Sequence, residues 1–153
     1  MAGKMKKSRR RSAQQRLASG THNEYRIFIS HATKDKWIAR MICEKLEAVG
    51  AKTFRDDRDI EGGDDIPDQI RKAIKRSHEF LLLLTPESKD RPWVLIELGV
   101  AWGTRKTRRI VAVLHHLEAE AIPGAVAWKR AISLNDFDNY VLEVKSRVER
   151  TRK

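Results

Sequence analysis

Glu97 is the residue of this sequence most suggestive of chemistry, because it places an acid on an otherwise apolar helical face. Pro92 suits the first turn of a helix, so we expect a helix to begin there. The spacing of Trp93-x-x-x-Glu97 then puts the carboxylate and the indole on one face. A carboxylate beside an aromatic ring at the edge of a core is a candidate catalytic group. The structural alternative is an ion pair with Arg91 or Arg105 near the helix terminus.

The segments around this helix alternate between strand-like and helix-like patterns. Apolar and β-branched runs predict strands at 24–30, 51–55, 79–85, 109–114 and 131–134. Helical periodicity predicts helices over 34–49, with Thr33 as N-cap and Gly50 as the stop, over 65–77, and over 137–148. Residues 115–130 are only weakly helical in pattern. The alternation predicts a flavodoxin-like three-layer α/β sandwich: a five-stranded parallel sheet of order 2-1-3-4-5 with helices on both faces.

This strand order also predicts where a ligand binds. Open α/β sheets hold ligands outside the carboxyl ends of their strands, where the winding reverses, and here that point lies between the first and third strands. The first strand ends at Ser30 and His31, and the loop 85–91 leads from the third strand into Trp93 and Glu97. We therefore expect Glu97 to face the same crevice as Ser30 and His31.

Other chemistries of this fold lack their motifs. The sequence contains no P-loop, no Gly-x-Gly-x-x-Gly fingerprint and no Gly-x-Ser-x-Gly elbow. A phosphoryl-accepting receiver domain is disfavoured, since the paired acids Asp56 and Asp57 follow the second predicted strand and the third ends in Thr85. The five histidines and Cys43 show no metal-ligand spacing, so no metal site is predicted. Cys43 lies within a helical apolar pattern and is expected to pack in the core.

The basic character of the chain is concentrated at its beginning. The 153 residues suit a single domain and carry a net charge of +11. Residues 1–23 contain seven of the cations and no acid, so we expect a disordered basic tail, with the folded domain at 24–153. The tail is either a solvated extension or a weak contact for polyanions. Its candidate cations are Lys4, Lys6, Lys7, Arg9, Arg10 and Arg11.

Targeting signals are not evident in this composition. No apolar run is long enough to cross a bilayer, and the basic beginning lacks the apolar segment of a secretory signal. The single cysteine suits a reducing compartment. These features predict a cytoplasmic protein without a membrane span.

Four segments, taken in order, resemble the successive sequence boxes of a Toll/interleukin receptor (TIR) domain of the bacterial type. They are Phe28-Ile29-Ser30-His31, residues 56–63, the apolar strand at 79–85, and Trp93-x-x-x-Glu97. The resemblance covers roughly residues 25–150. In enzymes of this family the Glu of the last motif cleaves NAD+ at the nicotinamide ribosyl bond, so the resemblance implies that Glu97 is catalytic.

The resemblance also implies the surroundings of the catalytic residue. NAD+ would be the substrate, without a further cofactor, and other TIR domains would be partners through head-to-tail self-association. The substrate-binding candidates are Trp93, Ser30, His31, Phe28, Arg55 and Arg58, and Lys34 is a further nearby cation. The segment 56–65 resembles the BB loop, which mediates these contacts and gates the site, through Asp57, Ile60, Gly62 and Gly63.

The implied reaction suits a single carboxylate. Nicotinamide leaves as a neutral molecule, so no general acid is needed, and a carboxylate near the oxocarbenium-like transition state stabilises its positive charge. The first bond cleavage is shared by hydrolysis to ADP-ribose and cyclisation to an ADP-ribose isomer, in bacterial immune signalling or defence. Two alternatives stay open: a non-catalytic TIR scaffold, and a nucleoside deoxyribosyltransferase, whose fold is similar and whose nucleophile is also a Glu.

Overall fold

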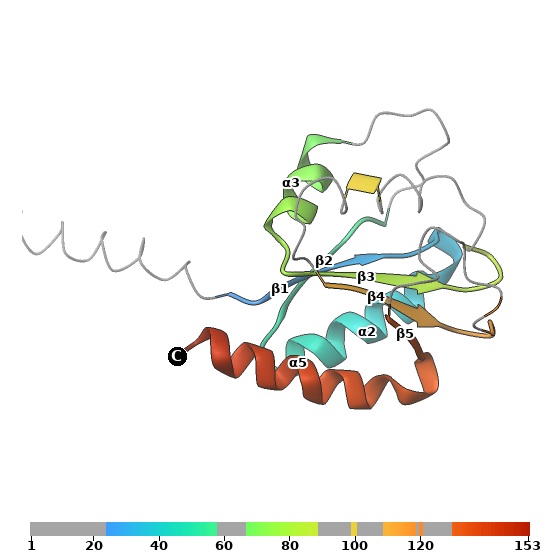
Figure 1. Cartoon of the computed structure of the whole chain (residues 1–153). Helices are drawn as coiled ribbons and strands as arrows, with labels where there is room; N and C mark the ends of the chain where they lie inside the picture. Colours follow the sequence, from blue (N-terminus) through green and yellow to red (C-terminus); the bar gives the residue numbers. More distant parts are fainter. Residues whose placement is uncertain (1–23, 58–66, 89–98, 101–108, 119, 121–129) are drawn as a thin grey trace, which may run out of the picture.

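The computed structural model describes residues 24–57, 67–88, 99–100, 109–118, 120 and 130–153. Five strands form one parallel sheet of order β2-β1-β3-β4-β5 (Figure 1), as the sequence predicts. The strands are β1 Arg26–Ser30, β2 Lys52–Arg55, β3 Glu79–Leu84, β4 Arg109–Leu114 and β5 Arg130–Ser133. The winding of the chain reverses between β1 and β3, which are neighbours in the sheet.

Helices cover both faces of this sheet. Helices α2 (Lys36–Ala48) and α5 (Phe137–Thr151) pack side by side on one face (Figure 1). Helix α3 (Asp68–Arg76) covers the other face. Two short 3-10 turns, η2 (Thr33–Asp35) and η4 (Leu134–Asp136), lead into α2 and α5. The three-layer flavodoxin-like prediction is therefore confirmed. Within the described part of the chain, no helix is long and apolar enough to span a membrane.

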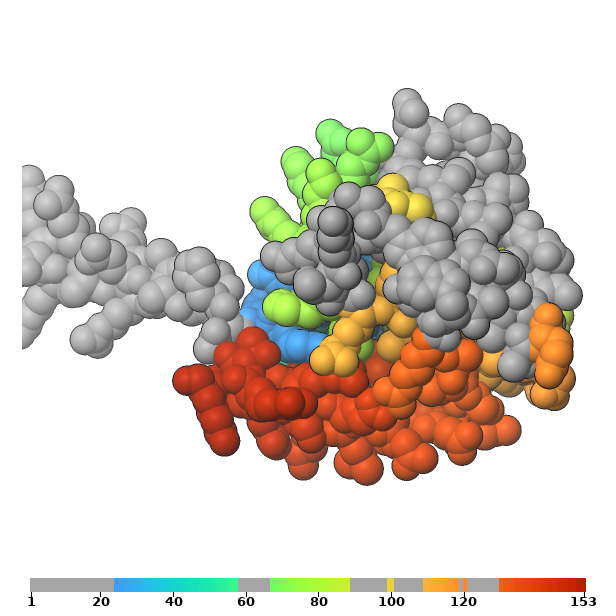
Figure 2. All heavy atoms as spheres, viewed as in Figure 1, coloured from blue at the N-terminus to red at the C-terminus, as the bar shows by residue number. Residues whose placement is uncertain are grey.

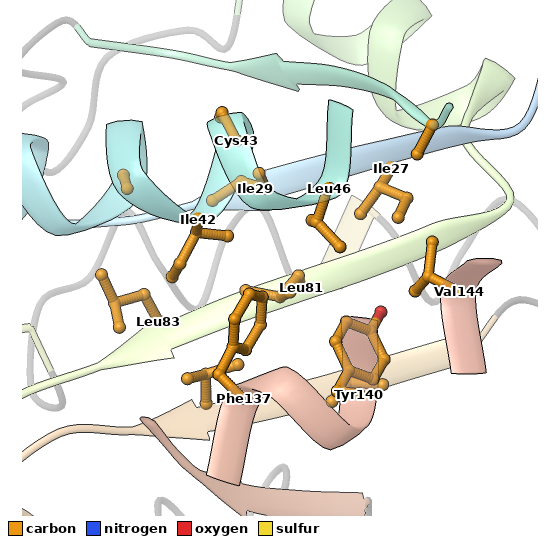
Figure 3. Close-up of a cluster of buried hydrophobic side chains, with 14 of the residues drawn as sticks. Ile27, Ile29, Ile42, Cys43, Leu46, Leu81, Leu83, Phe137, Tyr140 and Val144 are labelled. Atoms are coloured by element: carbon orange, nitrogen blue, oxygen red, sulfur yellow. The ribbon is translucent and has the colours of Figure 1, made fainter. Parts of the chain in front are cut away.

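The two-residue period of the strands divides the core between the two faces. In β1, Ile27 and Ile29 face α2 and α5, whereas Phe28 between them faces α3. The same alternation continues through β3 and β4. Figure 3 shows the first cluster, in which labelled side chains of α2, α5 and the strands meet: Ile27, Ile29, Ile42, Cys43, Leu46, Leu81, Leu83, Phe137, Tyr140 and Val144. Cys43 is buried there as a free thiol, which confirms its predicted packing role, and burial raises its pKa.

Several element boundaries differ from the predictions by a few residues. Thr33 is not the N-cap of α2, because it begins η2 and Asp35 takes the N-cap position. Helix α3 starts at Asp68, later than predicted, with Pro67 in extended conformation as its N-cap. Gly50 follows the C-cap of α2 and stops the helix, as predicted. Its φ angle is +91°, a backbone conformation that residues other than glycine rarely adopt.

One carboxylate is buried completely at the beginning of β3. Glu79 accepts hydrogen bonds from the hydroxyls of Tyr25 and Tyr140, and Arg147 Nη1 lies 2.6 Å from its Oε1. Figure 3 shows Tyr140 reaching from α5 into the core. Burial, reinforced by the Glu79 carboxylate, raises the pKa of both tyrosines. Arg147 also pairs with Glu143 at 2.8 Å. This cluster ties the end of α5 to β1 and β3 at the amino-terminal edge of the sheet.

Candidate functional site

Polar side chains are buried at the carboxyl ends of the two strands between which the winding reverses. Ser30 ends β1 and His31 follows it, while Thr85 and Ser88 follow β3. All four are at most 2% exposed, and Asp35 of η2 is 7% exposed. Buried polar groups are costly to desolvate and are retained where hydrogen bonds or function require them. This edge of the sheet is therefore the candidate site.

A hydrogen-bonded link joins the loops that leave β1 and β3. Thr85 Oγ1 donates to Asp35 Oδ2 over 2.6 Å, a short bond of the kind that a carboxylate accepts. The backbone N–H of Thr85 donates to Ser88 Oγ at 2.8 Å, and that hydroxyl donates to the carbonyl of Leu83 at 3.1 Å. The link holds one side of the site rigid.

His31 lies between two oxygen acceptors. Its Nδ1 is 2.8 Å from the carbonyl oxygen of Ala32, and its Nε2 is 3.2 Å from Oδ1 of Asp57. A carbonyl and a carboxylate both accept hydrogen bonds, so the ring donates to both only when each nitrogen carries a proton. The imidazole thereby connects the end of β1 to the residue at which the segment after β2 begins.

Asp57 places one carboxylate beside two cations and the His31 imidazole. Besides the His31 contact, its Oδ2 lies 3.4 Å from Lys36 Nζ and 3.3 Å from Arg55 Nη2. Arg55 also donates to the carbonyl of Lys36 at 3.5 Å. The Asp57 side chain is 31% exposed, so these cations are accessible to a competing anion from solvent. A pyrophosphate would compete with Asp57 for the same groups.

The structure brings four of the predicted site residues together and separates a fifth from them. Ser30, His31, Arg55 and Asp57 gather at the carboxyl ends of β1 and β2. Phe28, predicted to bind substrate, does not join them. Its side chain points to the α3 face, where its ring stacks on Phe80 with centroids 5.6 Å apart. The difference comes from position along the strand, because Phe28 lies two residues before the end of β1 and is covered by α3, whereas Ser30 ends the strand.

Of the other predicted site residues, one forms an exposed ion pair and the rest lie outside the described ranges. Lys34 pairs with Glu87 at 3.1 Å on an exposed surface. Gly99 and Val100 are helical, and Val100 packs against the α3-side core cluster, in agreement with a helix after β3. The predictions that lie outside the described residues are those for Glu97, Trp93, Arg58, Ile60, Gly62 and Gly63, and those for the tail cations.

Three polar residues of the site were not singled out in the sequence. Asp35 stands among lysines and reads as a solvated helix start, and Thr85 and Ser88 read as ordinary loop residues. Their burial depends on contacts between loops 50 residues apart, such as the Asp35–Thr85 bond. Only their position in the sequence could have indicated these residues, because Asp35 follows β1 and Thr85 and Ser88 follow β3, the two strands between which the winding reverses.

A histidine pair follows β4 at the same edge. The backbone N–H of His115 donates to the carbonyl of Leu84 at 3.0 Å, and the rings of His115 and His116 are 3.9 Å apart. His116 adopts φ 54°, in the left-handed region. Burial and the neighbouring His116 lower the pKa of His115. No group of three or more metal-binding side chains occurs among the residues with described positions.

Comparison with known proteins extends these observations. The family model described as "TIR domain" matches residues 27–145. The NAD(+) hydrolase TcpA of Theionarchaea archaeon is 27% identical, with 99% of this chain and 46% of that protein covered. The probable 2' cyclic ADP-D-ribose synthase BdTIR of Brachypodium distachyon is 24% identical, over 80% of this chain and 55% of that protein. The chain thus spans about half the length of these relatives.

A solved structure agrees with the sequence relatives. The metazoan TIR-STING receptor from C. gigas in complex with 2',3'-cGAMP superposes with a TM-score of 0.63 and 25% identity, over 83% of this chain and 40% of that one. The family model covers more than three quarters of the chain, and the sheet order and the strand-end site fit the same architecture. The chain therefore belongs to the TIR domain family.

Proposed function

We propose that this chain cleaves NAD+ at the bond between nicotinamide and ribose. The observation that carries the proposal is the set of buried polar side chains at the carboxyl ends of β1 and β3, where a sheet of this order binds ligands. Family membership supports the choice of substrate, because relatives are named as an NAD(+) hydrolase and a cyclic ADP-ribose synthase. NAD+ is then the substrate, and the reaction requires no further cofactor.

Glu97 is the catalytic carboxylate in this proposal. It lies nine residues beyond Ser88, on the segment that leaves the carboxyl end of β3. As the glycosidic bond breaks, the electron pair goes to nicotinamide, which leaves neutral, and positive charge develops on the ribose. A carboxylate stabilises that charge more in the transition state than in the ground state. Trp93, four residues earlier in the motif, is assigned to shaping the pocket.

Cations near the mouth of the site are assigned to the pyrophosphate of NAD+. Arg55 is in the described site, and Arg58 follows three residues later in the sequence. Arg55 is held by Asp57, so a bound pyrophosphate replaces the Asp57 carboxylate as its partner. Ser30 and His31 are assigned to the ribose end, since they terminate β1 beside the loop that follows β3.

The same site suggests how activity is gated. Asp57 is the second residue of the segment that resembles a BB loop, and its carboxylate anchors the start of that segment to His31, Lys36 and Arg55. We propose head-to-tail self-association through Asp57, Ile60, Gly62 and Gly63, with a neighbouring TIR domain displacing this anchor. We assign the product as either ADP-ribose or a cyclic isomer, and the biological role as immune signalling or defence in the cytoplasm.

We assign six cations of the tail to weak polyanion contacts: Lys4, Lys6, Lys7, Arg9, Arg10 and Arg11.

Nicotinamide release tests the proposal. The concentrated protein is incubated with NAD+ and the products are separated by chromatography. We expect release by the unmodified chain and by Glu149→Gln, an exposed acid on α5, but a loss of at least 100-fold for Glu97→Gln. Folding of each variant is verified by circular dichroism. Deoxynucleosides are assayed in parallel, since base exchange on them would instead identify a deoxyribosyltransferase. Absence of release at any protein concentration would favour a non-catalytic scaffold.

A further inference from the structure

The amino-terminal edge of the sheet, opposite the candidate site, carries a concentration of cations. Four of the five strands begin with Arg or Lys. The helices run back against the parallel strands, so the basic last turns of α3 and α5 end at the same edge. We define the basic rim as Arg26, Lys52, Lys75, Arg76, Arg109, Arg150, Arg152 and Lys153. All of these side chains are exposed except Arg26, which is partly buried.

Contacts show that one half of the basic rim is continuous. Arg152 Nη2, at the end of α5, donates to the carbonyl of Gly50 at 3.3 Å, just before β2. Lys52 Nζ and Arg26 Nη2 both lie near Glu24 Oε2, at 3.5 and 3.1 Å. The end of α5 and the beginnings of β2 and β1 therefore form one surface.

The other half joins the same surface through β3. The backbone N–H of Arg26 donates to Nδ1 of His78 at 3.0 Å, and His78 follows Arg76 by two residues. Arg109 at the beginning of β4 is the register partner of Glu79. Figures 1 and 2 agree with these contacts, since the beginning of β1, α3 and the end of α5 lie together at one end of the molecule.

Local structural effects explain only part of this charge. Cations in the last turn of a helix interact favourably with the helix dipole, which accounts for Lys75, Arg76 and Arg150. The dipole does not account for cations at the beginnings of strands. The buried charge of Glu79 is offset by Arg147, which is not counted in the basic rim. The other described acids near this edge are fewer than its cations: Glu24, Glu47, Glu149 and Glu143, the last of which pairs with Arg130 at the beginning of β5.

We propose that the basic rim binds the sugar-phosphate backbone of a nucleic-acid duplex, without reading its sequence. Clustered Arg and Lys side chains bind phosphates by releasing condensed counterions. Residues 1–23 carry seven further cations and precede Glu24 in the sequence, so their contribution to binding is tested separately from that of the rim. This binding does not depend on NAD+ cleavage, because the candidate site lies at the opposite edge of the sheet.

A duplex fits the basic rim better than a single strand or a membrane. Proteins bind single strands largely by stacking the bases on aromatic side chains, and they bind membranes by inserting apolar side chains. Among the described residues, the large exposed hydrophobic side chains are Trp37 and Leu142. Trp37 lies in the first turn of α2, at the other edge, and Leu142 lies two turns before Arg150 on α5. The rim itself offers charge alone.

Binding is measured by fluorescence anisotropy. The probes are labelled DNA and RNA duplexes of about 20 base pairs, long enough for the rim to contact several phosphates. The full chain is compared with a rim variant, Lys75→Gln, Arg76→Gln, Arg150→Gln and Lys153→Gln combined. A matched control neutralises four exposed cations outside the rim: Lys34, Arg40, Arg71 and Lys145. We expect the rim variant to lower affinity at least tenfold near 0.1 M salt and to reduce the salt slope by about 2 to 4. The control variant changes the slope by less than about 1.

A second variant separates the rim from the tail. This variant replaces six tail cations with Gln in the full chain: Lys4, Lys6, Lys7, Arg9, Arg10 and Arg11. We expect it to bind the duplex more weakly but to keep a salt-dependent affinity. Adding the rim substitutions then abolishes that remaining affinity. Equal weakening by the rim and control variants overturns the proposal, as does complete loss of binding on neutralising the tail alone. Tighter binding to single strands, or to phosphatidylserine vesicles, also contradicts it. Nicotinamide release is measured on the same samples, so failure of one function is distinguishable from failure of the other.

Discussion

Each edge of the sheet carries a carboxyl group among cationic partners, but the two groups differ in burial. At the amino-terminal edge, Glu79 is fully buried and held by Tyr25, Tyr140 and Arg147. At the carboxyl-terminal edge, Asp57 is 31% exposed and contacts two partly exposed cations, Lys36 and Arg55, besides the buried imidazole of His31. The first carboxylate has its hydrogen-bonding capacity used within the fold, whereas the second holds groups that can exchange it for another anion.

The difference indicates which edge stabilises the fold and which one binds ligand. A buried charge with a complete set of donors contributes to a single well-defined packing, and removing a partner is expensive. A partly exposed charge cluster contributes little stability, because water screens its ion pairs. The amino-terminal edge therefore anchors α5, and the carboxyl-terminal edge is free to specialise. Substitutions at each edge test this division.

The largest effect on stability is expected for Glu79→Ala. The substitution leaves two buried hydroxyls without their acceptor and Arg147 with only its Glu143 partner, at a cost of about 3 to 5 kcal/mol. Urea unfolding followed by circular dichroism measures the loss. The exposed Glu149→Ala serves as the control, with an expected change below about 0.5 kcal/mol. Similar small losses for both variants would refute an anchoring role for Glu79.

Thr85→Val is expected to have the next largest effect, at the other edge. It preserves the shape of the side chain but removes the hydrogen bond to the buried carboxyl group of Asp35, costing about 2 to 3 kcal/mol. Thr85→Ser retains the hydroxyl and should recover most of the stability. The same urea titration measures both. A Val variant as stable as the unmodified chain would show that the hydrogen bond to Asp35 does not stabilise this edge.

Alkaline pH should weaken the amino-terminal edge selectively. Burial and Glu79 raise the pKa of Tyr25 and Tyr140 above the ordinary value of 10.0, so the folded protein keeps both neutral while the unfolded chain loses their protons. Their contribution is complete below pH 10 and is lost as the pH rises further, by up to about 1.4 kcal/mol per tyrosine per pH unit. Urea unfolding at pH 9, 10 and 11 measures the slope. Tyr140→Phe should reduce it by roughly half, and an unchanged slope would be inconsistent with this assignment.

The smallest effect on stability, below about 1 kcal/mol, is expected for Asp57→Asn, because its ion pairs are partly exposed. Its effect on NAD+ cleavage should be larger. Removing the carboxylate frees Lys36 and Arg55 to bind the pyrophosphate, so KM should fall roughly three- to tenfold with little change in stability. Steady-state kinetics with NAD+ measures KM and kcat separately. A rise in KM would show that Asp57 organises the site instead of competing for it.

Patterns local in sequence predicted most of the fold. Strand order and both helical layers follow from the alternation of apolar periods, and Gly50 marked the end of α2 correctly. Contacts between segments far apart in the sequence could not be predicted from local patterns. Glu79 read as the first residue of an apolar strand, because its partners Tyr25 and Tyr140 are 54 and 61 residues away. Asp35 was missed for the same reason, since it is buried by a loop that follows β3.

The site prediction was limited by where along its strand each residue lies. Ser30 and His31 were selected by their position at a strand end, Arg55 as a nearby cation and Asp57 as part of the segment that resembles a BB loop, and the four do lie together. Phe28 was selected with the same motif and shares its face of the sheet with Ser30, but it lies two residues before the end of β1, so its ring is buried in the α3-side core. A motif read as a block of letters hides this difference, because it does not show where the strand ends.

Paired measurements on Glu97→Gln and Glu79→Gln test the central claim most directly. For each variant, the melting temperature and the rate of nicotinamide release from NAD+ per folded molecule are compared with those of the unmodified chain. We predict that Glu97→Gln melts within about 2 °C of the unmodified chain and loses release, whereas Glu79→Gln melts at least about 4 °C lower and retains release. Release by Glu97→Gln at the unmodified rate would contradict the account.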